Sequence, residues 1–173
     1  MTIYLPQLSD DPSLFPELEQ ALTEPDGLLA MGGDLSPERI ISAYQNGIFP
    51  WFSEGEPLLW WSPSERATIT AGNVHISKSM RRLLNKNKMS ITLNHCFSNV
   101  INACAKPRAT QAETWITTEM IDAYINLHQL GFAHSVEVWY DKKLVGGLYG
   151  VCVGQLFCGE SMFSEMDNSS KIA

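Results

Sequence analysis

The sequence predicts an α+β (mixed α/β) fold with a small N-terminal domain at 1–62 and a larger second domain at 63–173. Two observations support this prediction: helix-capping residues recur up to about residue 131, and three alternating segments joined by short turns follow residue 134. Helices followed by an antiparallel meander are typical of this fold class. The boundary is placed at Ser62-Pro63, after a stretch rich in Pro, Gly and aromatic residues.

The N-terminal domain is expected to contain one clear helix. Ser36 is its predicted N-cap, Pro37 its first helical residue and Gly47 its terminator. The aromatic segments at 49–52 and 60–63 are expected to form ordered loops.

Three further helices are predicted in the second domain. Ser77 caps the first, which runs to about Asn85; Asn94 opens the second; and residues 117–118 cap the third, which ends before Gly131.

From His134 the hydrophobic period changes to two, which predicts strands at 135–140, 144–153 and 156–162. Capping residues at 167–170 then predict a new helix, but the sequence stops at Ala173. Since a domain does not normally end on the first turn of a helix, the chain is expected to be C-terminally incomplete.

Positive charge is concentrated in one quarter of an otherwise acidic chain. The net charge is −7, yet residues 66–112 contain no acid and eight of the twelve bases. This segregation is typical of an anion-binding surface, although a solvated face with no partner explains the charge pattern equally well. The eight bases are Arg66, Lys78, Arg81, Arg82, Lys86, Lys88, Lys106 and Arg108.

Three of these bases form a stripe on the helix after Ser77. Lys78, Arg81 and Arg82 have helical i, i+3, i+4 spacing, opposite the apolar residues of that helix. The apolar residues are expected to form a buried anchor behind the stripe; they are Met80, Leu83 and Leu84.

The composition of the chain and the spacing of its Cys, His and Gly residues argue against several other classes of protein. The apolar runs are too short for a membrane helix, and the start of the chain lacks a signal peptide. The four cysteines form no C-x-x-C pair, so reduced thiols in the cytoplasm are expected. The histidines lack metal-ligand spacing, and no Gly-rich loop predicts a nucleotide cofactor. Gly159-Glu160-Ser161 is similar to a hydrolase elbow, but Phe163 occupies the final glycine position.

Several blocks in order along the chain resemble the bacterial leucyl/phenylalanyl-tRNA–protein transferases. These are GLLAMGGDLSPERIISAYQNGIFPWF (27–52), LWWSP (59–63), HISKSMRR (75–82), TWIT (114–117), residues 134–151 and LFCGESMFS (156–164). The resemblance implies a C-terminal domain similar to the N-acetyltransferase superfold. It also implies transfer of Leu or Phe, less readily Met, from tRNA to proteins beginning with Arg or Lys, which marks them for degradation. No cofactor is implied, and the enzyme is expected to be a monomer.

The resemblance also implies that part of the site is absent. Members of the family continue for several dozen residues, including a strand with an Asp and a Gln assigned to catalysis. The 173-residue chain by itself is therefore expected to lack transferase activity.

The family match suggests roles for residues whose chemistry fits the reaction. Glu160 is the candidate site carboxylate, although a lone strand Glu more often faces solvent. Leu148, Phe157 and Met162 match the aminoacyl pocket, although ordinary core positions would look the same.

Other residues match positions that hold tRNA. Trp51 and Trp115 correspond to residues that hold the 3′-terminal adenosine. The stripe, together with Lys86 and Lys88, is expected to bind phosphates of the acceptor stem. Two alternatives stay open: a non-catalytic RNA-binding module, and a thiol hydrolase built on Cys158.

Overall fold

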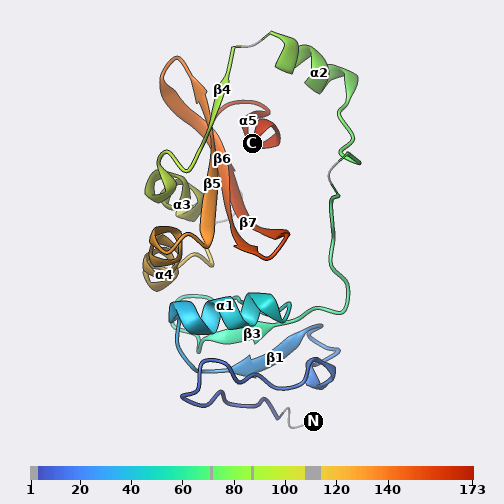
Figure 1. Cartoon of the computed structure of the whole chain (residues 1–173), viewed down its shortest axis with the longest axis vertical. Helices are drawn as coiled ribbons and strands as arrows, with labels where there is room; N and C mark the ends of the chain where they lie inside the picture. Colours follow the sequence, from blue (N-terminus) through green and yellow to red (C-terminus); the bar gives the residue numbers. More distant parts are fainter. Residues whose placement is uncertain (1–3, 71, 87, 108–113) are drawn as a thin grey trace.

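A computed structural model describes residues 4–70, 72–86, 88–107 and 114–173, and it confirms the α+β class. Arg108, one of the eight bases, lies outside the described residues. Two antiparallel sheets occupy opposite ends of the molecule, with α1 lying between them (Figure 1). The elements in chain order are η1 (Leu18–Gln20), β1 (Leu28–Met31), α1 (Pro37–Gln45), β2 (Phe49–Pro50), β3 (Leu59–Trp61), α2 (Lys78–Asn85), β4 (Ser90–Leu93), α3 (Phe97–Ala105), α4 (Thr118–Gln129), β5 (Ala133–Tyr140), β6 (Lys143–Val153), β7 (Leu156–Ser164) and α5 (Ser169–Ile172).

Helix α1 confirms the predicted caps. The Ser36 hydroxyl accepts a hydrogen bond from the Arg39 backbone N–H at 3.4 Å, Pro37 is the first helical residue, and Gly47 follows the helix with a φ of 75°. Its buried face includes Ile40 and Tyr44, which lie in the core.

The prediction of loops at 49–52 and 60–63 is wrong in part, because β2 and β3 are strands. They belong to a sheet of order β1-β3-β2, in which Phe49 pairs with Trp61 and Pro50 with Trp60. Two- and three-residue strands are too short to show an alternating pattern, and Pro50 is tolerated because β2 is at the edge. Trp60 is fully buried, and its indole N–H donates to the Gly32 carbonyl at 2.9 Å.

The predicted meander is confirmed as β5, β6 and β7, but the sheet has a fourth strand that the sequence did not predict. Strand β4 pairs antiparallel with β5, which gives the order β4-β5-β6-β7. Residues 90–93 do alternate polar and apolar side chains (Ser, Ile, Thr, Leu), but a run of only four residues is a weak signal and was overlooked; three of the four are exposed. Helices α3 and α4 cover one face of this sheet (Figure 1).

The predicted start of α3 at Asn94 is wrong, because the helix begins at Phe97. Asn94 has a φ of 56°, and its side-chain oxygen accepts from the Ser135 backbone N–H at 2.9 Å, so it ties β4 to β5. The N-terminus of α3 is satisfied by Glu137, whose carboxylate is fully buried and accepts from the backbone N–H groups of His95 and Cys96.

Helix α4 confirms the prediction: the Thr117 hydroxyl accepts from the Met120 backbone N–H, and Gly131 follows with a φ of 86°.

Helix α2 has the predicted bounds, but the prediction that its apolar residues form a buried anchor is wrong. No residue of α2 is buried; Met80 and Leu83 are half-buried and Leu84 is 40% exposed.

Candidate functional site

The candidate site centres on an irregularity in β7. Along the β6–β7 pair, Tyr149 lies opposite Ser161 and Gly150 lies opposite Gly159, so Glu160 is the extra residue of a β-bulge. A bulge breaks the alternation of side chains and redirects one of them, and bulges are common next to active sites.

The bulge directs the Glu160 carboxyl towards the helices that cover the sheet. Burial raises the pKa of this group to about 7, while a hydrogen bond from the Tyr44 hydroxyl and the nearby Arg66 guanidinium act in the opposite direction. A glutamate with this pKa exchanges its proton close to neutral pH, as a group that handles protons in catalysis must.

Three buried tyrosines surround this carboxyl, each from a different element. Tyr44 comes from α1, Tyr124 from α4 and Tyr149 from β6. The Tyr44 and Tyr124 hydroxyls share a hydrogen bond of 2.7 Å across 80 residues of sequence. The Tyr149 hydroxyl is buried without a hydrogen-bond partner among the described residues. Burial, and then the Glu160 charge, raises the pKa of all three phenols, which stay protonated at neutral pH.

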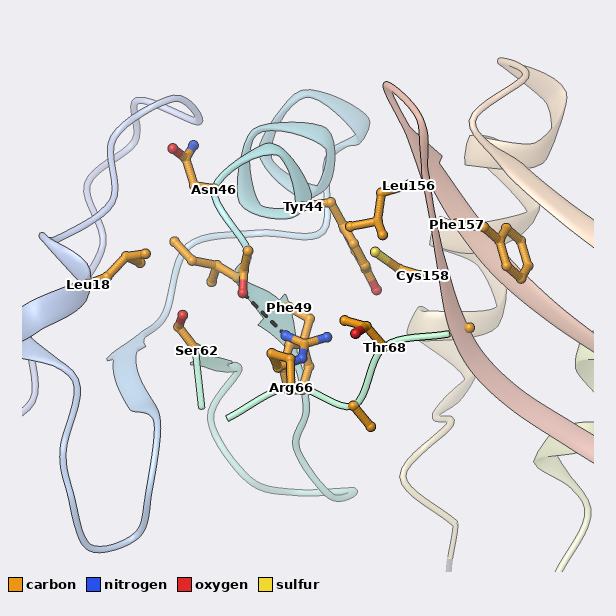
Figure 2. A pocket seen from close by; sticks show the side chains of 14 residues that line it. Leu18, Tyr44, Asn46, Phe49, Ser62, Arg66, Thr68, Leu156, Phe157 and Cys158 are labelled. Carbon is orange, nitrogen blue, oxygen red and sulfur yellow. Dashed lines mark hydrogen bonds between the residues drawn. The ribbon is translucent and has the colours of Figure 1, made fainter. Parts of the chain in front are cut away.

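A cavity of about 310 Å³ lies beside this cluster, between the end of α1 and the start of β7. Tyr44 from α1 and Cys158 from β7 both line it, and their side chains extend into the space between these two elements (Figure 2). Arg66 also lines the cavity, with its guanidinium 4.8 Å from the centroid of the Phe49 ring and donating a hydrogen bond to the Gly47 carbonyl at 3.4 Å. An arginine from the connecting segment is thus held against the first sheet near the Glu160 carboxyl.

The three predicted pocket residues lie together on the opposite face of the sheet. Leu148 pairs directly with Met162, and the ring of Phe157 covers Gly150, two residues along β6 from Leu148. Phe157 is 42% exposed and Met162 48% exposed, so both apolar side chains are open to a ligand. A side chain at Gly159 would meet no atom within 4 Å, so the space between Phe157 and Met162 is open. The structure therefore brings this trio together, but places it across β7 from the Glu160 carboxyl.

The two predicted adenosine-binding tryptophans lie in different surroundings. Trp51 follows β2 and is 48% exposed; its ring lies 5.3 Å from that of Trp61, whose indole N–H donates to the Trp51 carbonyl at 2.7 Å. Trp115 precedes α4 and packs partly buried against the core. No ring contact between Trp51 and Trp115 is present in the described part of the chain.

The predicted phosphate-binding residues are exposed and form no salt bridge with any residue that the structure describes. Lys78, Arg81 and Arg82 lie on α2, followed by Lys86 and Lys88. Within the described ranges the single salt bridge joins Arg39 to Asp34, far from these cations. Exposed cations without protein partners are available to an anionic ligand.

The remaining candidate groups are less suited to chemistry. Burial, and then the Glu160 charge, raises the pKa of the Cys158 thiol, which opposes the thiolate that a hydrolase requires. Across the residues that the structure describes, no group of three or more His, Cys, Asp or Glu side chains is placed to hold a metal ion. No helix in the same residues is both long and apolar enough to cross a membrane.

Sequence reasoning missed Tyr44, Tyr124 and Arg66 as members of the site. Tyr44 and Tyr124 lie on helices at positions where a tyrosine is typical of core, and Arg66 is distinguished in the sequence only as one of eight bases. The available signal was that a buried tyrosine hydroxyl needs a hydrogen-bond partner.

Comparison with known proteins gives consistent matches along the chain. The family model described as leucyl/phenylalanyl-tRNA protein transferase matches residues 68–173, and the model of that family's N-terminal domain matches residues 33–64. A protein from Psychromonas ingrahamii named leucyl/phenylalanyl-tRNA–protein transferase is 64% identical over 173 residues, which covers all of this chain and 73% of the relative. Proteins with the same name from Tolumonas auensis and Cellvibrio japonicus are 56% and 55% identical; the matches cover 100% and 96% of this chain, and 74% and 71% of those relatives.

Glu160→Gln is expected to change stability in a pH-dependent way. Because the folded state holds the Glu160 proton up to a pKa of about 7, against the ordinary glutamate value of 4.5, the wild type loses stability as pH rises from about 4.5 to 7. The variant lacks this loss, so relative to wild type it gains up to about 3 kcal/mol between pH 4.5 and pH 8. Urea denaturation at both pH values measures the difference. Glu165→Gln, at an exposed position just after β7, serves as the control. An equal Glu160→Gln effect at both pH values would contradict the raised pKa.

Proposed function

The chain belongs to the family of leucyl/phenylalanyl-tRNA–protein transferases, and from that premise we propose that it transfers leucine or phenylalanine from aminoacyl-tRNA to the N-terminus of acceptor proteins. The observation that carries this proposal is the 64% identity over all 173 residues to a relative of that name. We further propose that methionine is a poorer donor, that acceptors begin with Arg or Lys and are thereby marked for degradation, and that the enzyme works as a monomer in the cytoplasm.

The reaction needs positioning more than activation. The acceptor amine attacks the ester carbonyl carbon, the bond from that carbon to the terminal ribose oxygen breaks, the amine loses a proton and the ribose oxygen gains one. An ester is already activated relative to an amide, so no ATP is required. Holding the two substrates together provides much of the acceleration.

In this proposal Glu160 organises the site and handles protons, and is not the sole base. Its pKa of about 7 supports this role, because the group can accept a proton and return it near neutral pH. Its position across β7 from the apolar trio favours an organising and electrostatic role over direct contact with the transferred side chain.

The apolar trio is the proposed receptor for the leucine or phenylalanine side chain. Exposed apolar side chains beside the open space at Gly159 support this assignment. Met162 is flexible enough to accept both an aliphatic and an aromatic guest. Discrimination should be coarse, since hydrophobic fit provides only about 1–3 kcal/mol per methylene. The trio consists of Leu148, Phe157 and Met162.

Trp51 and Trp115 are proposed to hold the 3′-terminal adenosine, and the cations of α2 to contact acceptor-stem phosphates. The half-exposed ring of Trp51 supports the first role, since a base stacked on an aromatic ring gains about 1–3 kcal/mol. The absence of protein partners for the α2 cations within the described residues supports the second. Phosphate contacts would position the tRNA without reading its sequence.

A transfer assay tests the proposal. Phe-tRNA and a peptide beginning with Arg are incubated with the intact protein as expressed from its gene, and the extended peptide is detected by mass spectrometry. We expect product with this peptide and none when the first residue is Ala. Product should be lost in Trp115→Ala and reduced in Glu160→Gln, while Cys158→Ala should retain it. Binding of tRNA without product would favour an RNA-binding module, and dependence on Cys158 a thiol hydrolase; either result contradicts the proposal.

Salt dependence tests the phosphate contacts separately. Affinity for Phe-tRNA should fall steeply as salt rises from 50 to 200 mM, because neutralised phosphates release counterions. Arg81→Ala and Arg82→Ala should each reduce the slope of log K against log salt by about 1 and weaken binding of different tRNA sequences equally. Lys143→Ala, a cation at the start of β6 outside the basic segment, should leave the slope unchanged. An affinity that stays flat with salt would overturn the assignment.

A further inference from the structure

The cluster around Glu160 contains more hydroxyl groups than the proposed reaction uses. Tyr44 is 4% exposed and Tyr124 is fully buried, so neither hydroxyl can rely on water for its hydrogen bonds. They come from two helices that are distant in the sequence, α1 and α4, and both lie near the carboxyl on β7. The titratable and charged groups facing Glu160 are Tyr44, Tyr124, Tyr149, Cys158 and Arg66.

Counting donors fixes the direction of the hydrogen bonds. A tyrosine hydroxyl has one proton to donate, and an ionised carboxylate only accepts. When Glu160 is ionised, Tyr44 therefore donates to Glu160, and the 2.7 Å bond between the tyrosines must run from Tyr124 to Tyr44. When Glu160 is protonated, the carboxyl can donate to Tyr44 and Tyr44 to Tyr124. The chain can reverse without moving a heavy atom.

We propose that Tyr44 and Tyr124 are positioning residues for the transfer reaction, and that their reversible hydroxyl chain holds the Glu160 carboxyl in place in both of its protonation states. This inference rests on the proposed function. It gives α1 a part in the chemistry, because Tyr44 lowers the pKa of a carboxyl on β7.

The ionisation of Glu160 itself provides the test. Carboxyl carbon NMR of the intact protein gives its titration midpoint in wild type, Tyr44→Phe, Tyr124→Phe and Tyr149→Phe. Tyr44→Phe removes the hydroxyl that donates to the ionised Glu160 carboxylate, so the titration midpoint of Glu160 should rise by about half a pH unit or more. In Tyr124→Phe the midpoint should rise by less, because Tyr124 acts only through Tyr44. Tyr149→Phe removes a buried hydroxyl without a partner in the described structure, and should leave the midpoint unchanged.

The sign of the shift separates positioning from a merely structural role. If Tyr44→Phe only loosened the packing, water would reach the carboxyl and its midpoint would fall towards 4.5. A midpoint that falls or stays constant in Tyr44→Phe overturns the inference.

Activity adds a second readout. The acidic limb of the pH profile for transfer of Phe to the Arg peptide should move to higher pH in Tyr44→Phe, by the same amount as the midpoint. A wild-type protein with no transfer at any pH contradicts the proposed function. An active wild type whose profile is unchanged by Tyr44→Phe contradicts only this inference.

Discussion

The arrangement of the site depends on a hydrogen bond between two tyrosine hydroxyls that belong to different parts of the chain. Tyr44 and Tyr124, 80 residues apart in the sequence, meet at 2.7 Å where α1 lies against α4. Isolated hydroxyls at such depth would each lose their hydration, so each stabilises the other's burial. The same contact places the Tyr44 hydroxyl beside Glu160; its hydrogen bond and the nearby Arg66 lower the pKa of the carboxyl, which desolvation raises to about 7.

The arrangement of the site also requires the bulge in β7, because the bulge lets the two faces of this strand serve different functions. In a regular strand Phe157 and Met162, five positions apart, would lie on opposite faces; the extra residue puts both on one face and leaves the Glu160 carboxyl turned towards the helices. One strand thus presents an apolar surface on one side and an ionisable group on the other. The surfaces proposed for tRNA lie outside this cluster, on α2 and at Trp51, and satisfy different requirements: exposure, and charge without protein partners.

Local signals predicted much of this fold. Ser36, Ser77 and Thr117 cap their helices as predicted, because a capping hydroxyl acts within three residues of itself. Pairings between distant segments were missed. Strand β4 is defined by its partner β5, and Glu137 caps α3 from forty residues away. The candidate site shows the same difference between local signals and distant contacts. Blocks of sequence typical of the family indicated Glu160, the apolar trio and the tryptophans, and the roles of these residues stay predictions. Tyr44, Tyr124 and Arg66 could not be grouped with them from a sequence in which they are far apart.

A double-mutant cycle on the two hydroxyls tests the central claim most directly. The free energy of unfolding is measured at pH 8 for wild type, Tyr44→Phe, Tyr124→Phe and the double variant. If α1 and α4 are joined through this hydrogen bond, the two substitutions should not be additive, and the coupling free energy should be about 1 kcal/mol. Additivity within the error of the measurement would show that the hydroxyls do not interact, and would contradict the account.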